Sequence, residues 1–227
     1  MLTKTEELAY WLGIVQTDGC YNEYFDKKKN RVVYRIIMNV TKSLPMLVKF
    51  QEINRKLFNR KSNIYKKTTG SYESKIYVKE YLDEFNKMDF HFKDISKIPS
   101  WITENLEYFG AYVAGIIDGD GHILIRRPAC PQCLVSITSG IKPEELKKIV
   151  MHKFNCSVNI TTEEGISFIS GREIVGHWHT LEFYISSKNS NLIEKYILPW
   201  IIMPHKKEKI ERFLKERQYN KPRGLVV

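Results

Sequence analysis

Two short segments of the sequence share a pattern that can bring two carboxylates to one place. They are WLGIVQTDGCY, at Trp11–Tyr21, and VAGIIDGDGHI, at Val113–Ile123, and in each an apolar stretch runs into Asp-Gly. The two aspartates, Asp18 and Asp120, are separated by almost half of the 227-residue chain. A pair of carboxylates offers hard oxygen ligands to Mg²⁺ or Mn²⁺, and such ions support the hydrolysis of phosphate esters.

Glycines at matching positions of the two segments predict how the aspartates are held. Gly13 and Gly115 predict that two helix backbones approach closely, so that one chain brings both carboxylates to one centre. Gly19 and Gly121, which follow the aspartates, predict a left-handed backbone that ends each helix abruptly. The backbone of these last two glycines is a further candidate for metal ligation.

An aspartate at the C-terminal end of a helix lies in an unfavourable position. It meets the partial negative charge of the helix dipole, and two such ends brought together repel each other. A divalent cation relieves both effects, so we predict that Asp18 and Asp120 are metal ligands. A single Asp-Gly is more often a helix-ending turn without chemistry; the repetition in matched contexts favours a metal site.

The segments that follow the two motifs repeat one order of elements. Period-two alternation predicts antiparallel strands, and apolar residues at three- and four-residue spacing predict helices. Strands are expected at 31–43, 62–67 and 74–79 in the first half, and at 122–127, 133–140, 157–162 and 179–186 in the second. After the motif helices, further helices are expected at 44–58, 81–88, 142–154 and 205–218. His205–Lys209 is expected to be a solvated helix start, and 221–227 a frayed end.

The predicted fold class is therefore α+β, with two pseudo-symmetric αββαββα halves. The first half is expected at residues 1–97 and the second at 108–227, with a linker at 98–107 where Pro99 interrupts regular structure.

The composition points to a polyanionic partner. The chain has 36 Lys and Arg against 26 Asp and Glu, a formal net charge of +10 and a pI near 9.3, although many basic proteins only have a solvated lysine surface. No apolar run approaches the length of a membrane span, and four cysteines are too few for a secreted disulfide framework. We expect a soluble intracellular protein, in a prokaryotic cytoplasm or an organelle, which the sequence does not distinguish.

The two motifs resemble the LAGLIDADG motif of the homing endonucleases, closely at VAGIIDGDG and more loosely at WLGIVQTDG. The resemblance covers the whole chain, because the element order after each motif also matches. It implies antiparallel β-saddles on a central two-helix interface, and a monomer that binds double-stranded DNA in the major groove. It further implies a magnesium-dependent enzyme that cuts both strands of a long target and leaves short 3′ overhangs.

The first copy departs from the family pattern at its sixth position, where Gln16 replaces the usual acid. The resemblance assigns metal binding to the eighth position, so this departure leaves Asp18 in place. Asp118, the sixth-position acid of the second copy, is expected to serve packing or hydrogen bonding at the helix end.

Accessory lysines are also implied by the resemblance. Lys42 follows a strand where the family often places Gln or Lys near the cleavage centre, and its counterpart in the second half is Ser139. Lys188 resembles the family lysine that positions water or steadies phosphate charge, with Lys79 as a weaker counterpart. The alternative for each is a solvated lysine at a strand end.

Polar and basic side chains on the expected strands are candidates for DNA contact, because one face of a saddle meets the groove. Arginine on guanine and glutamine or asparagine on adenine are the base-reading pairs. Since the two halves carry different residues, the expected target is asymmetric. The candidates are Tyr21, Asn22, Tyr24, Lys28, Arg31, Tyr34, Arg35, Lys61, Lys66, Lys67, Lys75, His122, Arg126, Arg127, Gln132, Ser136, Arg172, His177 and His179.

Cys130 and Cys133 form a CxxC, which also occurs in zinc and redox sites. Cys156, His177 and His179 could complete a zinc site only if the fold brought them together. A hairpin turn with ordinary thiols is the preferred interpretation.

Two other functions fit parts of the sequence. One is an RNA maturase, which assists intron splicing on the same scaffold, with or without nuclease activity. Loss of an eighth-position acid would favour it, but both are present. The other is an unrelated basic nucleic-acid-binding module, which the repeated element order argues against.

Overall fold

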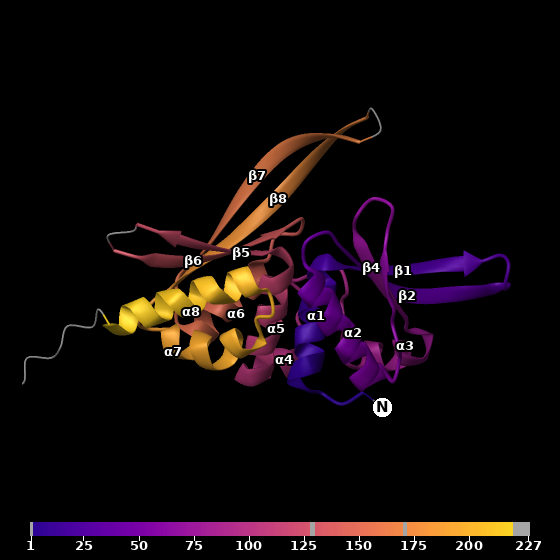
Figure 1. The fold of residues 1–227 in the computed structure, drawn as a ribbon, viewed down its shortest axis with the longest axis horizontal. Coiled ribbons are helices and arrows are strands. Elements are labelled where there is room, and N and C mark those ends of the chain that lie inside the picture. The colour runs from indigo at the N-terminus through magenta and orange to yellow at the C-terminus, as the bar shows by residue number, and fades with distance from the viewer. Residues whose placement is uncertain (1, 128–129, 170–171, 220–227) are drawn as a thin grey trace, which may run out of the picture.

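The computed structural model describes residues 2–127, 130–169 and 172–219, which form two similar halves around two central helices (Figure 1). Each half contains a four-stranded antiparallel sheet. The strand order is β1-β2-β4-β3 in the first half and β5-β6-β8-β7 in the second. The expected α+β fold with two αββαββα halves is confirmed.

Most element bounds lie within a few residues of the sequence expectations, which gave no range for the strand at Gly19–Asp26. The first half contains α1 (Glu6–Asp18), β1 (Gly19–Asp26), β2 (Arg31–Val40), α2 (Leu44–Phe58), β3 (Ile64–Lys66), β4 (Tyr72–Tyr77), a 3₁₀ turn (Lys79–Tyr81) and α3 (Leu82–Lys87). The second half follows with α4 (Ser100–Glu104), α5 (Leu106–Asp120), β5 (Gly121–Arg126), β6 (Gln132–Ser139), α6 (Glu144–Phe154), β7 (Val158–Ile169) and β8 (Arg172–Ile185). The chain then passes through α7 (Ser190–Leu192), a π turn (Ile193–Ile197) and a 3₁₀ turn (Leu198–Trp200) to α8 (Pro204–Tyr219).

The two central helices begin at side chains that cap them. The Thr5 hydroxyl accepts a hydrogen bond from the Leu8 N–H at the start of α1, over 3.2 Å. The Asn105 side chain accepts hydrogen bonds from the N–H groups of Glu107 and Tyr108 at the start of α5. Both helices end at an aspartate, which fixes where each carboxylate emerges.

α1 and α5 pack with their backbones almost in contact, as the glycine positions predicted. A Cβ atom on Gly13 would lie 2.3 Å from the carbonyl oxygen of Tyr112, and one on Gly115 would lie 2.4 Å from that of Tyr10. Residues 8–16 of α1 and 109–118 of α5 are buried. The interface between the halves therefore has no room for a side chain at either glycine.

We expect Gly115→Ala to lower the free energy of unfolding by about 2 to 3 kcal/mol, because the new methyl group overlaps a backbone oxygen that cannot rotate away. Gly140→Ala is the matched control, since a Cβ on Gly140 meets nothing within 4 Å. Urea denaturation measures both variants. Equal stability of the two variants would contradict the close packing of α1 on α5.

Side chains alternate between two faces of each sheet. Ile36, Met38 and Val40 of β2 are buried against the helices, as are Leu181 and Phe183 of β8. We call the opposite surface of each sheet its open face. It is the surface on which a ligand can reach the strands.

The β7–β8 hairpin is longer than the sequence predicted and projects beyond the rest of the molecule (Figure 1). Gly165 and Gly176 are opposite each other in the hairpin, and they interrupt the alternation that signals a strand. The Trp178 ring covers both glycines, at 2.6 Å and 2.5 Å from where their Cβ atoms would be. The β7–β8 pairing continues on both sides of the two glycines.

Candidate metal and nucleic-acid site

Asp18 and Asp120 lie side by side at the ends of α1 and α5. A Cβ atom on Gly119, the residue before Asp120, would lie 3.5 Å from Oδ2 of Asp18. Asp120 is more exposed than Asp18, and each aspartate directly precedes the first strand of its sheet. The structure thus brings the two sequence-predicted carboxylates to one centre.

Both carboxyl groups have raised pKa values. Burial by surrounding protein and then the charge of Asp18 raise the pKa of Asp120 to about 6. Burial also raises the pKa of Asp18, and the ammonium group of Lys206 partly opposes both shifts. Each carboxylate is held where its negative charge is disfavoured, and a cation would relieve this cost.

The glycines after the aspartates do not adopt the left-handed backbone that we expected. Gly19 has φ −83° and Gly121 has φ −82°, which is extended backbone. A Cβ on Gly19 would lie 2.4 Å from the Val15 carbonyl oxygen, and one on Gly121 equally close to that of Ile117. Close approach to the preceding helical turn, rather than a positive φ, therefore requires glycine here.

The sixth motif positions form a mirrored pair of hydrogen-bonding groups. Tyr10 Oη donates to Asp118 Oδ2 over 2.8 Å, and Tyr112 Oη donates to Gln16 Oε1 over 2.6 Å. Each tyrosine thus reaches from one central helix to the sixth position of the other.

The two sixth-position residues differ because their surroundings have opposite polarity. The Gln16 amide donates to backbone carbonyl oxygens of the segment 91–97, among them that of Asp94 at 3.1 Å. The Asp118 carboxylate accepts from the backbone N–H groups of Ile202 at 2.7 Å and Met203 at 3.1 Å. Segment 91–97 presents hydrogen-bond acceptors to Gln16, whereas the backbone at Ile202 and Met203 presents donors to Asp118. This difference explains why position 16 has an amide in place of an acid. Asp118 has the hydrogen-bonding role that was expected.

Lys206 is a site residue that sequence reasoning missed. It lies in the segment expected to be a solvated helix start, yet it is only 7% exposed. Its Nζ donates to the carbonyl oxygens of Ile117 at 2.7 Å, Asp118 at 2.8 Å and Gly119 at 3.3 Å. Burial lowers the pKa of Lys206, and the nearby aspartates oppose that shift. The lysine was misassigned because only the tertiary fold directs it to the C-terminal end of α5. The expected frayed end at 221–227 lies outside the described residues.

The accessory lysines are placed differently from one another. Lys42 lies just beyond β2, whose Met38 pairs with Gly19, so it is at the Asp18 end of its sheet. Lys79 is exposed in the 3₁₀ turn after β4. Ser139 is the last residue of β6, near the Asp120 end of the second sheet.

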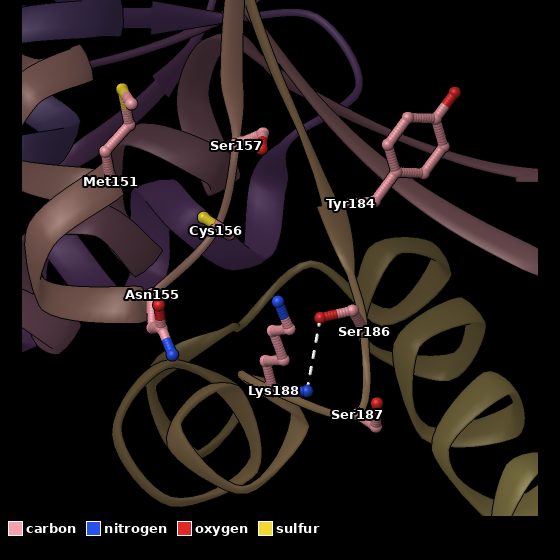
Figure 2. A pocket seen from close by; sticks show the side chains of 8 residues that line it. All are labelled: Met151, Asn155, Cys156, Ser157, Tyr184, Ser186, Ser187 and Lys188. Carbon is pink, nitrogen blue, oxygen red and sulfur yellow. Dashed lines mark hydrogen bonds between the residues drawn. The ribbon is translucent and has the colours of Figure 1, made fainter.

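Lys188 does not lie with the aspartates. It follows Ile185, which pairs with Cys133, whereas Gly121 pairs with Ile137. Four strand residues span about 13 Å, so Lys188 is at the outer end of the sheet. Lys188 lines a cavity of about 580 Å³. The other lining residues are Met151, Asn155, Cys156, Ser157, Tyr184, Ser186 and Ser187 (Figure 2). The cleavage-centre role expected for it is therefore wrong.

Many of the DNA-contact candidates lie on the open faces of the two sheets. Strand register places there Asn22, Tyr24, Arg31, Arg35 and Lys75 in the first half, and His122, Arg126, Gln132 and Ser136 in the second. Lys28 lies in the β1–β2 turn, Arg127 follows β5 and Lys61 precedes β3, all three exposed. The Lys66 ammonium lies 5.9 Å from the centre of the Tyr72 ring, and that of Lys67 pairs with Glu73 at 2.6 Å. Arg172 begins β8, and its side chain lies outside what the structure describes.

Lys66 and four other candidates lie on the opposite side of their sheets; Lys66 pairs with Tyr72, which pairs with the buried Val40. Tyr21 and Tyr34 pack against the core, and the Tyr21 ring stacks on Phe92 with centroids 5.2 Å apart. His177 and His179 lie on the β8 face that carries Leu181 and Phe183. Composition does not show which of two alternating positions faces the helices, so register alone makes these residues weaker candidates for DNA contact than those on the open faces.

The CxxC is part of an ordinary hairpin. All four cysteines have free thiols; Cys130 is exposed and Cys133 is buried in β6. His177 lies 3.3 Å from a Glu164 carboxylate oxygen and His179 lies 2.9 Å from the Thr162 hydroxyl. The structure does not assemble these groups into a zinc site.

Metal binding at the aspartate pair would need oxygen donors from a ligand as well. In the part of the chain that the structure describes, no group of three or more His, Cys, Asp and Glu side chains converges. Asp18 and Asp120 supply two hard carboxylates under mutual repulsion, which fits a divalent cation whose shell is completed by phosphate oxygens and water. Within the same residues, no helix has the length and apolar character for a bilayer crossing.

Solved structures share this fold at low sequence identity, although no family model and no curated protein matches the chain. A structure of I-DmoI with its target DNA nicked in the coding strand, in the presence of Mn, has a TM-score of 0.57 and 17% identity over 85% of this chain and 97% of that one. The I-LtrWI LAGLIDADG homing endonuclease bound to target DNA has a TM-score of 0.53 and 13% identity, covering 95% and 92%. The meganuclease I-SmaMI bound to uncleaveable DNA has a TM-score of 0.54 and 14% identity, covering 96% and 91%.

Proposed function

We propose that this chain, which has the two-repeat fold of the LAGLIDADG homing endonucleases, is a site-specific endonuclease that cuts both strands of DNA. The observation that carries the proposal is the pair of carboxylates, Asp18 and Asp120, each directly before the first strand of its sheet. A phosphate held across both faces would meet the two acids together.

Mg²⁺ or Mn²⁺ is the proposed cofactor, and Asp18 and Asp120 would hold it. When bound, the cation supplies positive charge that offsets the charge on the scissile phosphate. Backbone oxygens of Gly19 and Gly121 are further candidate ligands, since both residues follow the acids directly. The raised pKa values of the two carboxyl groups indicate that their negative charges are disfavoured without a cation, which supports the proposed metal site.

Hydrolysis adds the oxygen of water to phosphorus and breaks one P–O bond, and the leaving oxygen takes up a proton. Lys206 keeps a fixed positive charge beside the two carboxylates, because three carbonyl oxygens hold its ammonium group at the end of α5. We propose that this charge steadies the phosphate in the centre and limits the repulsion between the acids. Lys42, exposed at the Asp18 end of its sheet, is the candidate for a second contact to phosphate.

A monomer with two different open faces is suited to a long asymmetric duplex. The first face carries Arg31, Arg35 and Lys75, and the second has Glu182 next to Arg126. Since each half presents its own side chains, the proposed target lacks two-fold symmetry. Short 3′ overhangs are part of the same proposal.

The direct test is cleavage of a library of long DNA duplexes with Mg²⁺, with Ca²⁺ or EDTA in parallel reactions, followed by sequencing of the ends. We expect site-specific double-strand cuts with Mg²⁺ alone. Binding to the recovered target should weaken steeply with salt, by about 1000-fold or more between 50 and 200 mM, because phosphate contacts release counterions. Tight binding of structured intron RNA without DNA cleavage under any metal would instead favour a maturase.

A further inference from the structure

Arg35 occupies the middle of the open face in the first half. It lies on β2, the second strand of the sheet order, between Asn22 of β1 and Tyr77 of β4. Its guanidinium carbon lies 4.5 Å from the centre of the Tyr24 ring, which is a close stack of cation on aromatic. The ring thus restricts the movement of the guanidinium group.

The hydrogen-bonding capacity of Arg35 is not used up by the protein. Its Nε is buried and has no hydrogen-bond partner among the described residues. A buried donor without a partner costs free energy, because stacking on a ring does not satisfy its hydrogen bond. Because Nε itself is shielded from solvent, an incoming acceptor would be met by the terminal Nη groups of the guanidinium.

The matching position in the second half is occupied differently. Gly19 pairs with Met38 as Gly121 pairs with Ile137, and this equivalence aligns Arg35 with Leu134. Leu134 is fully buried, and its side chain has no hydrogen-bond donor. The second half therefore lacks a counterpart to Arg35 at this position.

The arginine of the second open face is already engaged within the protein. Arg126 aligns with Tyr24, and its Nη1 donates to the Tyr184 hydroxyl over 3.3 Å. Its Nη2 also lies 3.9 Å from a Glu182 carboxylate oxygen, where the first half has Lys75. Among the arginines that the structure describes on the two open faces, Arg35 combines stacking on an aromatic ring with an unpaired Nε, and the equivalent of Glu182 beside it is Lys75.

We propose that Arg35 reads a guanine in the half of the DNA target bound by the first repeat, and that the second repeat makes no such demand at the matching position. The guanidinium fork fits the O6 and N7 acceptors of guanine in the major groove. Stacking on Tyr24 reduces the freedom that Arg35 loses on binding, which increases discrimination between bases. This inference rests on the proposed function, because it names a feature of the target.

The test measures DNA binding in Ca²⁺ to the target recovered from the cleavage library. Duplexes carrying each of the four bases at every position of both half-sites are compared. The wild-type protein should prefer guanine by about 10- to 100-fold at one position of the first half-site. Arg35→Ala should remove that preference, and Arg35→Lys should weaken it.

Two further variants test the stack. Tyr24→Phe keeps the ring and should keep the preference, whereas Tyr24→Leu should reduce it. Arg31→Ala, on the same face at the start of β2, is the matched control and should weaken binding to all four duplexes equally. Thermal unfolding of each variant shows whether it is folded.

Three results would overturn the inference. If Arg35→Ala weakens binding equally for all four bases, Arg35 contacts phosphate and does not read a base. If a folded Arg35→Ala retains the guanine preference, Arg35 is not the reader. In both cases the endonuclease proposal stands, whereas absence of site-specific binding and cutting by the wild-type protein removes both.

Discussion

Asp120→Asn is expected to abolish double-strand cleavage and at the same time to stabilise the metal-free protein. Cleavage is lost because the variant removes one of the two charged ligands at the centre. Stability rises because the variant also removes a carboxylate whose pKa is raised to about 6 by burial and by Asp18. The same substitution therefore separates function from folding.

The stabilisation has a defined dependence on pH. The folded protein holds the Asp120 proton more tightly than the unfolded chain, whose aspartates titrate near 3.8. The wild-type protein therefore loses stability as pH rises from about 4 to about 6, and the advantage of asparagine is complete above pH 6. The full shift corresponds to at most about 3 kcal/mol. Since Asp120 is open to solvent, screening reduces our expectation to about 1 kcal/mol.

Thermal unfolding in EDTA at pH 7.5 and pH 4 measures this effect, and cleavage of the recovered target in Mg²⁺ measures activity. We expect Asp18→Asn to abolish cleavage too, with DNA binding largely retained for both variants. Asp83→Asn, at an exposed position of α3, is the matched control and should leave cleavage unchanged. Full cutting by either site variant would remove that aspartate from the mechanism.

Exchanging the sixth-position residues for their isosteres, as Gln16→Glu or Asp118→Asn, is expected to cost about 2 to 4 kcal/mol of stability each. Glutamate at position 16 would place a carboxylate among the carbonyl oxygens of segment 91–97. Asparagine at position 118 would weaken acceptance from the backbone N–H groups of Ile202 and Met203, and would place an amide near donors. Shape is preserved in both variants, so the loss measures polarity alone.

Urea denaturation in EDTA checks this prediction. Glu52→Gln, an exposed isosteric change on α2, is the control and should shift stability by less than about 0.5 kcal/mol. Both site variants should still cleave DNA at low temperature, because the eighth-position aspartates remain. If either variant matched the control in stability, the opposite polarity of the two segments would not be what selects Gln16 and Asp118.

The sequence by itself determined the repeat, the fold class and the two aspartates. These follow from local rules: Asp-Gly at the end of an apolar stretch, glycine where helices touch, and periods of two and of three to four residues for strands and helices. Such signals lie within a few residues of one another along the chain. The bounds of α2 and the order of elements in each half were predictable for this reason.

Only the tertiary structure decided which polar groups meet. Lys206 reaches Asp118 from another element, and Lys188, which the sequence placed at the centre, lies at the outer end of its sheet. Tyr21 and Tyr24 differ by three positions and face opposite sides of one strand. Register and helix approach set these outcomes, because a hydrogen bond depends on distances of a few ångström between segments that are far apart in sequence.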